Sequence, residues 1–278
     1  MGRIRALTST DVSDARELIA RDPVSNCFVD SRVRNAGVDP WRLGGEMWGY
    51  FDDDEVLCSL LYVGANLVPV ASTPASRAAF ADRLRQTGRR SSSIVGIDEE
   101  VLDLWRILEA SWGPCREIRG RQPLLVMDSD PTGDVDPDVR FIGIDELDVI
   151  VPACIDMFTH EVGVSPVAGG GGMAYQARIA DLVRSSRSIG RIENGVVVFK
   201  AEVGAATPMV CQVQGVWVDP GHRGRGISVP AMAATVRLAR THIAPVVSLY
   251  VNDFNTIARR TYESCGFRQH ATFATVLF

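Results

Sequence analysis

Residues 216–228 read VWVDPGHRGRGIS, and they join an apolar, strand-like run to a helix-like run. The backbone N–H groups at the start of a helix have no partner within the helix and carry the positive end of its dipole. Glycine has no Cβ, so Gly224 and Gly226 would let the chain pass close to a ligand. Because Arg223 and Arg225 alternate with these glycines, the corner predicts a site for a phosphate or pyrophosphate.

Two other phosphate-binding patterns fit this corner poorly. A dinucleotide fingerprint requires G-x-G-x-x-G, but here Val229 stands at the third glycine position. No acidic partner for a ribose follows at the expected distance. A Walker-type loop ends in G-K-[ST], and the corner contains no lysine. A coenzyme A corner is the third candidate.

Length and composition indicate an ordinary globular protein. The chain has 278 residues, 46% of them hydrophobic and 23% charged, which suggests one large domain or two of average size. A formal charge of −5 argues against nucleic-acid binding by bulk electrostatics. The six cysteines are scattered without a C-x-x-C pair, so we expect reduced thiols, no metal site and a cytoplasmic location. No membrane association is expected, since no apolar run is long enough to cross a bilayer.

Residues 128–138 read DSDPTGDVDPD and have the composition of a linker. It divides the chain into a first domain over 1–130 and a second over 138–278. Both halves follow one order of elements: one helix in the first half or two in the second, a hairpin and a strand, then helix, strand, helix and a final extended segment. We interpret this as a duplication whose sequence identity has mostly been lost; two unrelated halves are the alternative. Where the second half has its glycine corner, the first has VASTPASR, so the first half looks like a copy that has lost its site.

A second motif follows the corner. Residues 251–267, VNDFNTIARRTYESCGF, resemble a hallmark of the GCN5-related N-acetyltransferases (GNAT), and residues 223–228 resemble that family's coenzyme-binding signature. The resemblance covers 138–278 well and the first half only through its element order. It implies an α/β fold, with a mixed α+β sheet in each of two tandem GNAT-like domains. Each domain would be a mostly antiparallel sheet flanked by helices.

The resemblance also implies acetyl-CoA as co-substrate and assigns residues to it. The strand before the corner would pair its backbone with the pantetheine arm and polarise the thioester carbonyl. The corner and helix start would hold the pyrophosphate. The coenzyme-binding residues are then Val216, Trp217, Val218, Arg223, Gly224, Arg225, Gly226, Ile227, Ser228 and Asn255.

Acyl transfer to an amine also needs a group that protonates the leaving thiolate and a group that takes the amine's proton. By resemblance to the family, Tyr262 is the acid. Glu202 is the first candidate base, because a carboxylate in an apolar strand can have its pKa raised by burial. A solvent-facing position for Glu202 is the alternative. Glu161, in the region expected to line the acceptor pocket, ranks second.

We therefore predict an N-acetyltransferase that moves an acetyl group from acetyl-CoA to a primary amine through a ternary complex. A non-catalytic acyl-CoA sensor or scaffold and a nucleotide-binding regulator are the alternatives. The acceptor is a small-molecule or peptide amine, and the acidic chain favours a cationic one. The sequence leaves the oligomeric state open.

Overall fold

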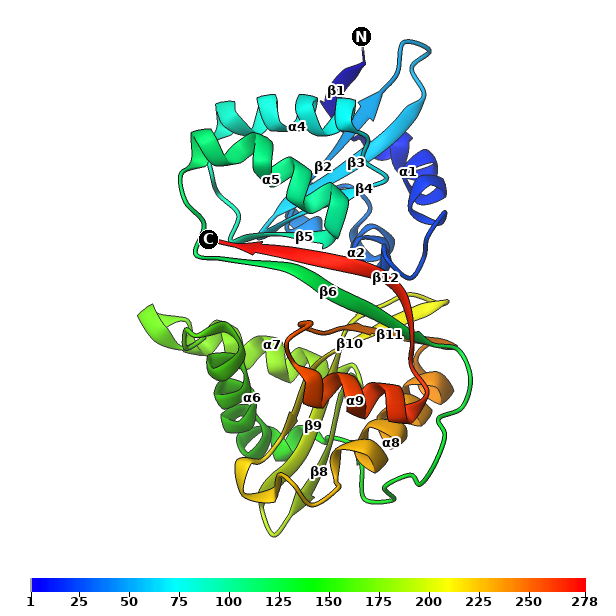
Figure 1. The fold of residues 1–278 in the computed structure, drawn as a ribbon, viewed down its shortest axis with the longest axis vertical. Coiled ribbons are helices and arrows are strands. Elements are labelled where there is room, and N and C mark those ends of the chain that lie inside the picture. Colours follow the sequence, from blue (N-terminus) through cyan, green and yellow to red (C-terminus); the bar gives the residue numbers. More distant parts are fainter. Residues whose placement is uncertain (1) are drawn as a thin grey trace. The chain divides into compact units, whose positions relative to one another are not determined.

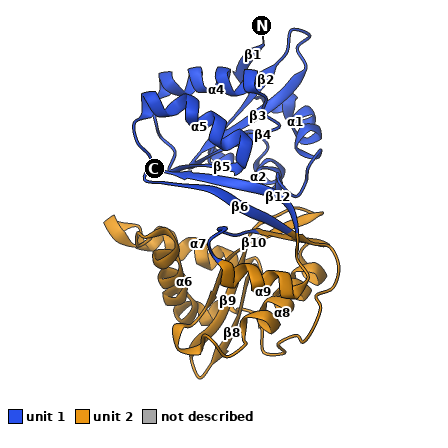
Figure 2. Ribbon diagram, viewed as in Figure 1, with its two compact units in different colours: residues 1–125, 250–255, 269–278 blue, residues 126–249, 256–268 orange. Residues whose placement is uncertain are grey.

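The structure is a computed structural model that describes residues 2–278. It divides into two compact units that are not continuous in sequence (Figure 2). Unit 1 comprises residues 1–125, 250–255 and 269–278, and unit 2 comprises residues 126–249 and 256–268. The two contiguous domains proposed above, 1–130 and 138–278, stay a sequence-based prediction. No helix among residues 2–278 is long and apolar enough to span a bilayer.

Unit 1 is a sheet with helices on both faces (Figure 1). Its strands lie in the order β1-β2-β3-β4-β5-β12-β6, and β4 and β5 are parallel while the pairs from β1 to β4 and β5–β12 are antiparallel. The strands are β1 (Arg3–Ala6), β2 (Gly45–Phe51), β3 (Leu57–Gly64), β4 (Asn66–Val70), β5 (Ser93–Ile97), β6 (Glu117–Met127) and β12 (Arg268–Leu277). The helices are α1 (Val12–Ile19), α2 (Cys27–Ala36), α3 (Pro40–Leu43), α4 (Pro74–Thr87) and α5 (Asp98–Trp112).

Alternation along the strands of unit 1 supplies a separate core to each face of the sheet. Met47 and Leu60 pack with α1 and α2, whereas their neighbours Trp48 and Leu61 pack with α4 and α5. The sequence did not predict α2, because its apolar residues are interrupted by charged ones.

Unit 2 repeats the same order of elements. Its strands are β7 (Arg140–Phe141), β8 (Ser188–Glu193), β9 (Val196–Ala206), β10 (Val210–Val218) and β11 (Val246–Tyr250). They pair antiparallel from β7 to β10, and β10 pairs parallel with β11. Its helices are α6 (Leu147–Val162), α7 (Gly172–Arg184), α8 (Ser228–His242) and α9 (Thr256–Cys265). The mostly antiparallel, helix-flanked sheets confirm the predicted fold class.

A tight turn at Asn194-Gly195 joins β8 to β9. Both residues have positive φ, 49° and 77°, as a tight turn between antiparallel strands requires. Glu193 then pairs with Val196, which sets the register of β8 against β9. That register places Gly190 opposite Lys200 and Ser188 opposite Glu202.

The last strand of the chain lies in the sheet of unit 1. Residues Phe273 to Leu277 of β12 pair antiparallel with residues Ile97 to Ser93 of β5. Ala274 and Val276 are fully buried in the core that α4 and α5 cover. The terminal Phe278 packs against Trp105 and Trp112. The sequence predicted the strand but not its place, since strand pairing over this separation leaves no local pattern.

We expect Val276→Ala to lower the free energy of unfolding by about 2 kcal/mol, because it removes two methyl groups from a closed core site. Val196→Ala is the control, since Val196 is 48% exposed and Val276 is 0% exposed. Urea denaturation followed by circular dichroism measures both. Equal losses in the two variants would contradict the placement of β12 in a buried core.

Candidate functional site

The central feature of unit 2 is that β10 loses one neighbour partway along its length. Parallel pairing with β11 covers Val210 to Gln212, where Gln212 lies opposite Ser248. On its other side β10 stays paired with β9 as far as Val218. In the described part of unit 2, residues 213–218 therefore have no strand on the β11 side. Their backbone groups on that side can bind an extended ligand as a strand would.

A bulge deforms β10 within this open segment. Gln214 pairs with Glu202 and Trp217 pairs with Lys200, so β10 has one residue more than β9 between these two pairs. Gly215 takes φ 60°, a conformation that favours glycine. A bulge turns a backbone group away from the ladder and is a common way of aiming such a group at a ligand.

Three of the predicted coenzyme-binding residues, Val216, Trp217 and Val218, lie in the open segment and are half-buried. Trp217 packs against the core of α6 and α7, so its indole stabilises the sheet while its backbone faces the gap. Val218 uses its carbonyl to accept a hydrogen bond from Arg223 Nε at 3.0 Å. This contact connects the strand to the corner that follows.

The glycine corner turns the chain through two residues in the left-handed region. Gly224 and Gly226 have φ values of 75° and 78°, which disfavour other residues. A Cβ at either position would meet no atom within 4 Å, so the conformation and not crowding requires glycine here. Asp219 closes the turn by bonding His222 Nδ1 at 2.7 Å, and this contact lowers the pKa of the Asp219 carboxyl.

The two arginines of the corner differ in their surroundings. Arg223 is engaged with the Val218 carbonyl. Arg225 is exposed, and its guanidinium makes no hydrogen bond or ion pair with residues 2–278. Arg225 is thus the cation of the corner that is available to an anion.

The N-terminus of α8 follows the corner directly. Ile227 precedes the helix and gives no side-chain cap, and Ser228 directs its hydroxyl to Thr261 Oγ1 at 3.2 Å. The N–H groups of Ser228 and Val229 therefore lack helical partners. Pro230 lies in the first turn, where its missing N–H removes no helical bond. A long helix with uncapped N–H groups beside Arg225 is suited to a diphosphate.

Tyr262 lies on α9, the helix that Ser228 contacts through Thr261. Its side chain is 7% exposed and packs against Phe267. Burial, with a smaller contribution from the charge of Glu161, raises the pKa of its hydroxyl above the ordinary value of 10.0. Tyr262 is therefore protonated at neutral pH. Asn255 is exposed and directly precedes α9.

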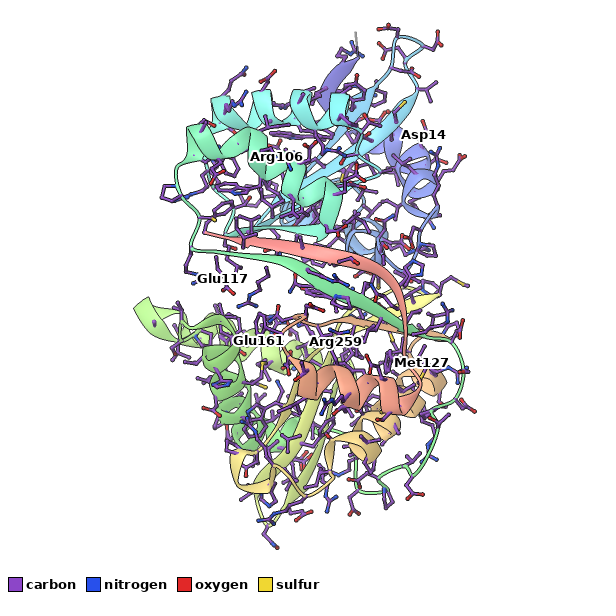
Figure 3. All side chains as sticks on the ribbon, in the orientation of Figure 1. Asp14, Arg106, Glu117, Met127, Glu161 and Arg259 are labelled. Carbon is purple, nitrogen blue, oxygen red and sulfur yellow. The ribbon has the colours of Figure 1, made fainter. Side chains whose placement is uncertain are left out.

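Glu161 occupies the last turn of α6 and is exposed (Figure 3). Its charge acts on Tyr262, so the structure brings the second candidate base close enough to influence the candidate acid.

Glu202 has an environment that differs from both expectations. It is 3% exposed, so the solvent-facing alternative is wrong. Its Oε1 accepts a hydrogen bond from Lys200 Nζ at 2.6 Å, and Cys154 Sγ lies 3.4 Å from the same oxygen. Burial acts to raise the pKa of Glu202, but the ammonium of Lys200 outweighs it and the pKa is lowered. The expectation of a raised pKa is thus wrong, because the strand supplies a cation two residues earlier.

Several groups that the sequence did not single out complete this buried cluster. Lys200, the only lysine of the chain, is 0% exposed. Tyr175 donates from its hydroxyl to the Cys154 carbonyl at 3.0 Å, and Arg178 approaches Glu202 Oε2 to 3.7 Å. The sequence could have indicated the ion pair, because Lys200 and Glu202 lie on one face of an apolar strand. It could not have indicated the residues of α6 and α7 that contact the pair, because they are distant in sequence.

The cluster lies beside the bulge of β10. A Cβ built on Gly215 would come within 3.3 Å of Lys200 Nζ and 3.5 Å of Glu202 Cδ. The open segment, the glycine corner, Tyr262 and the Lys200–Glu202 pair all belong to unit 2.

The equivalent corner of unit 1, between β4 and α4, is filled by the protein itself. The N–H and hydroxyl of Ser72 both donate to the Glu100 carboxylate, at 3.0 and 2.7 Å. Arg77 is 3% exposed and donates to the Ser72 carbonyl and to Asp103. Thr73 caps α4 by accepting from the Ser76 N–H. Donors that would meet a phosphate are thus already satisfied, and Glu100 stands where an anion would bind.

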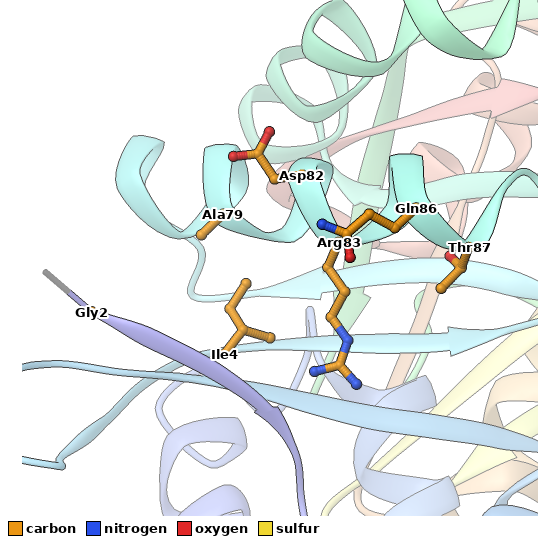
Figure 4. A pocket seen from close by; sticks show the side chains of 7 residues that line it. All are labelled: Gly2, Ile4, Ala79, Asp82, Arg83, Gln86 and Thr87. Atoms are coloured by element: carbon orange, nitrogen blue, oxygen red, sulfur yellow. The ribbon is translucent and has the colours of Figure 1, made fainter.

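A groove of about 520 Å³ lies between β1 and α4 of unit 1 (Figure 4). Its lining includes Arg83, whose guanidinium stacks 4.3 Å from the centre of the Trp48 ring. None of its lining residues belongs to the cluster or corner of unit 2: Gly2, Ile4, Ala79, Asp82, Arg83, Gln86 and Thr87.

Two family models match separate parts of the chain. Residues 184–267 match the Acetyltransferase (GNAT) family, and residues 45–150 match a domain of unknown function, DUF4081. The comparison with curated proteins gave no match.

Three solved structures are similar over almost the whole chain. A GNAT-family acetyltransferase from Colwellia psychrerythraea has a TM-score of 0.61 at 12% identity, over 99% of both chains. A tandem GNAT protein from the clavulanic acid biosynthesis pathway has a TM-score of 0.61 at 13% identity, over 99% of this chain and 98% of that one. A GCN5-related N-acetyltransferase from Sphaerobacter thermophilus has a TM-score of 0.64 at 17% identity, over 99% of this chain and 94% of that one.

The fold is therefore that of the tandem GNAT proteins, as predicted. Residues 184–267, which carry the open strand, the glycine corner and Tyr262, match the GNAT family model, while the first half matches a different model. The match indicates acyl-CoA-dependent N-acyltransferase activity in general terms.

Lys200→Met should lower stability at pH 7 by about 3–5 kcal/mol, because it leaves a buried carboxylate without its cation. The variant should also respond to pH in the opposite direction.

In the native chain the pKa of Glu202 is lowered on folding, so the contribution of Glu202 to the free energy of unfolding is lost as pH falls. In the variant burial dominates and raises the pKa, so the variant should regain part of its loss between pH 7 and pH 5.

Urea unfolding at both pH values measures this effect. The double variant Lys200→Met/Glu202→Gln removes both charges and should recover most of the stability at pH 7. A single variant whose deficit does not shrink at pH 5 would contradict the assigned pairing.

Proposed function

We propose that the chain is an N-acetyltransferase that moves an acetyl group from acetyl-CoA to a primary amine in a ternary complex. The observation that carries this proposal is the open backbone edge of residues 213–218, which continues into a corner with unpaired N–H groups and Arg225. That order matches a ligand with a strand-like arm followed by a diphosphate. The family match of residues 184–267 supports the same ligand.

In the proposed complex the diphosphate binds Arg225 and the N-terminus of α8, with Arg223 holding the corner in shape. Ile227 and Ser228 contribute backbone donors, and the pantetheine arm lies along Val216 to Val218. A backbone N–H near the bulge polarises the thioester carbonyl, whose oxygen gains charge as the amine adds. Asn255 would bind the pantetheine or fix α9.

The chemical step forms a C–N bond and breaks the C–S bond. Tyr262, whose hydroxyl is protonated at neutral pH, gives its proton to the departing thiolate. The amine's proton passes to a carboxylate. Glu202 lies beside the bulge but is 3% exposed, so it would take the proton through an intervening water, and its lowered pKa makes it a weak base; Glu161, which is exposed, is the second acceptor.

An acyl-CoA sensor or scaffold is the second candidate. The observation that favours it is the neutralisation of Glu202 by Lys200, which limits the basicity of the site. Tight coenzyme binding without transfer to any amine would favour the sensor, and transfer would favour the enzyme.

Arg225→Glu should weaken acetyl-CoA binding about 10- to 100-fold, because it replaces a charge-assisted contact to the diphosphate by repulsion. Isothermal titration calorimetry measures the dissociation constant. The control is Arg237→Glu, which makes the same charge change at an exposed position further along α8. Equal affinities for the two variants would refute the assignment of the corner.

Tyr262→Phe should lower kcat about 100-fold or more while the affinity for acetyl-CoA is unchanged, because only the acid is removed. Release of free coenzyme A thiol, measured with a thiol reagent, reports turnover. Tyr62→Phe is the control: Tyr62 is a buried tyrosine of unit 1 that donates to the Gly44 carbonyl. Full turnover by the Tyr262 variant would show that another group protonates the thiolate.

A further inference from the structure

Arg178 is a cation with little to balance it. It lies on α7 with its side chain 47% exposed, and its one ion pair with a described residue is the 3.7 Å contact to Glu202 Oε2. The charge of Glu202 is already met by Lys200 at 2.6 Å. Lys200, Glu202 and Arg178 together therefore carry one positive charge in excess.

No other described carboxylate lies within ion-pair distance of Lys200 or Arg178. Asp181, one turn further along α7, pairs with Arg184 at 3.3 Å. Two further groups that contact the cluster, Cys154 and Tyr175, are held protonated because burial raises the pKa of each, that of Cys154 to about 12. Within the cluster, the guanidinium of Arg178 is therefore accessible to solvent, whereas the ion pair of Lys200 and Glu202 is buried.

The excess charge is close to the proposed reaction centre. Glu202 Cδ would lie 3.5 Å from a Cβ on Gly215, and Arg178 is the next group outward from Glu202. Lys200 cannot contact a ligand directly, since it is 0% exposed. Arg178 is accordingly the charged member of the cluster that a bound acceptor can reach.

We propose that Arg178 selects acceptors that carry a carboxylate close to the reacting amine, as amino acids do. This inference rests on the proposed function and names its substrate class. The planar guanidinium can bind a carboxylate through two parallel hydrogen bonds. It replaces the expectation of a cationic acceptor, which was based on the net charge of −5 of the whole chain, because local charge acts more strongly than distant charge.

The same charge assists the chemistry. A positive charge beside the acceptor lowers the pKa of its ammonium and so increases the fraction of free amine, the form that attacks the thioester. This matters here because Glu202 is a weak base. A polyamine or other acceptor without an anion would instead be repelled.

Matched acceptor pairs that differ only in the carboxylate test this inference: L-alanine with L-alaninamide, and β-alanine with β-alaninamide. The expected kcat/KM is at least about 10-fold higher for one or both acids than for the matching amide. In Arg178→Gln that preference should disappear, because the rate with the acid should fall more than the rate with the amide, and Arg178→Lys should retain part of it. A purely structural role for Arg178 would lower both members of a pair alike.

Arg184→Gln is the control, since Arg184 lies on the same helix and pairs with Asp181. It should keep the native preference. Transfer to the amides at rates equal to the acids, or an acid preference that survives in Arg178→Gln, would overturn the inference and leave the proposed function intact. Bound acetyl-CoA with transfer to no primary amine, including ethylamine and spermidine, would defeat the proposed function itself.

Discussion

The parting of β10 from β11 after Gln212 is the constraint on which the site depends. A central strand normally satisfies its backbone on both sides, and an unpaired edge inside a sheet is costly unless water or a ligand meets it. The bulge at Gly215 and the corner at Gly224 and Gly226 come after this separation along the chain. They direct the chain away from the β11 side of the sheet and into α8. The proposed ligand restores the bonds that the sheet gives up.

The two units show how one arrangement of elements can keep or lose such a site. In unit 2 the strand-to-helix corner leaves N–H groups and Arg225 free. In unit 1 the same corner binds the carboxylate of Glu100, and Arg77 is buried against Ser72 and Asp103. An internal carboxylate costs no association entropy, so a dissolved anion competes poorly with it. The corner of unit 1 thus holds a fixed internal contact, where the corner of unit 2 leaves its donors available.

The predictable part of this protein was the part recorded in short stretches of sequence. The helix start after the glycine corner is local, and the structure places α8 there as expected. The pKa of Glu202 was mispredicted because its main determinant, Lys200, was not considered as a partner on the same strand face. Arg178 and the pairing of β12 with β5 depend on contacts between distant segments, which a single sequence does not reveal.

A crystal structure of the chain with acetyl-CoA would locate the coenzyme on the protein. We expect the pantetheine arm to be hydrogen-bonded along residues 216–218, and the diphosphate to lie on Arg225 and the first N–H groups of α8. A carrier bound in unit 1, or one in unit 2 that leaves the edge of β10 without a partner, would contradict this expectation.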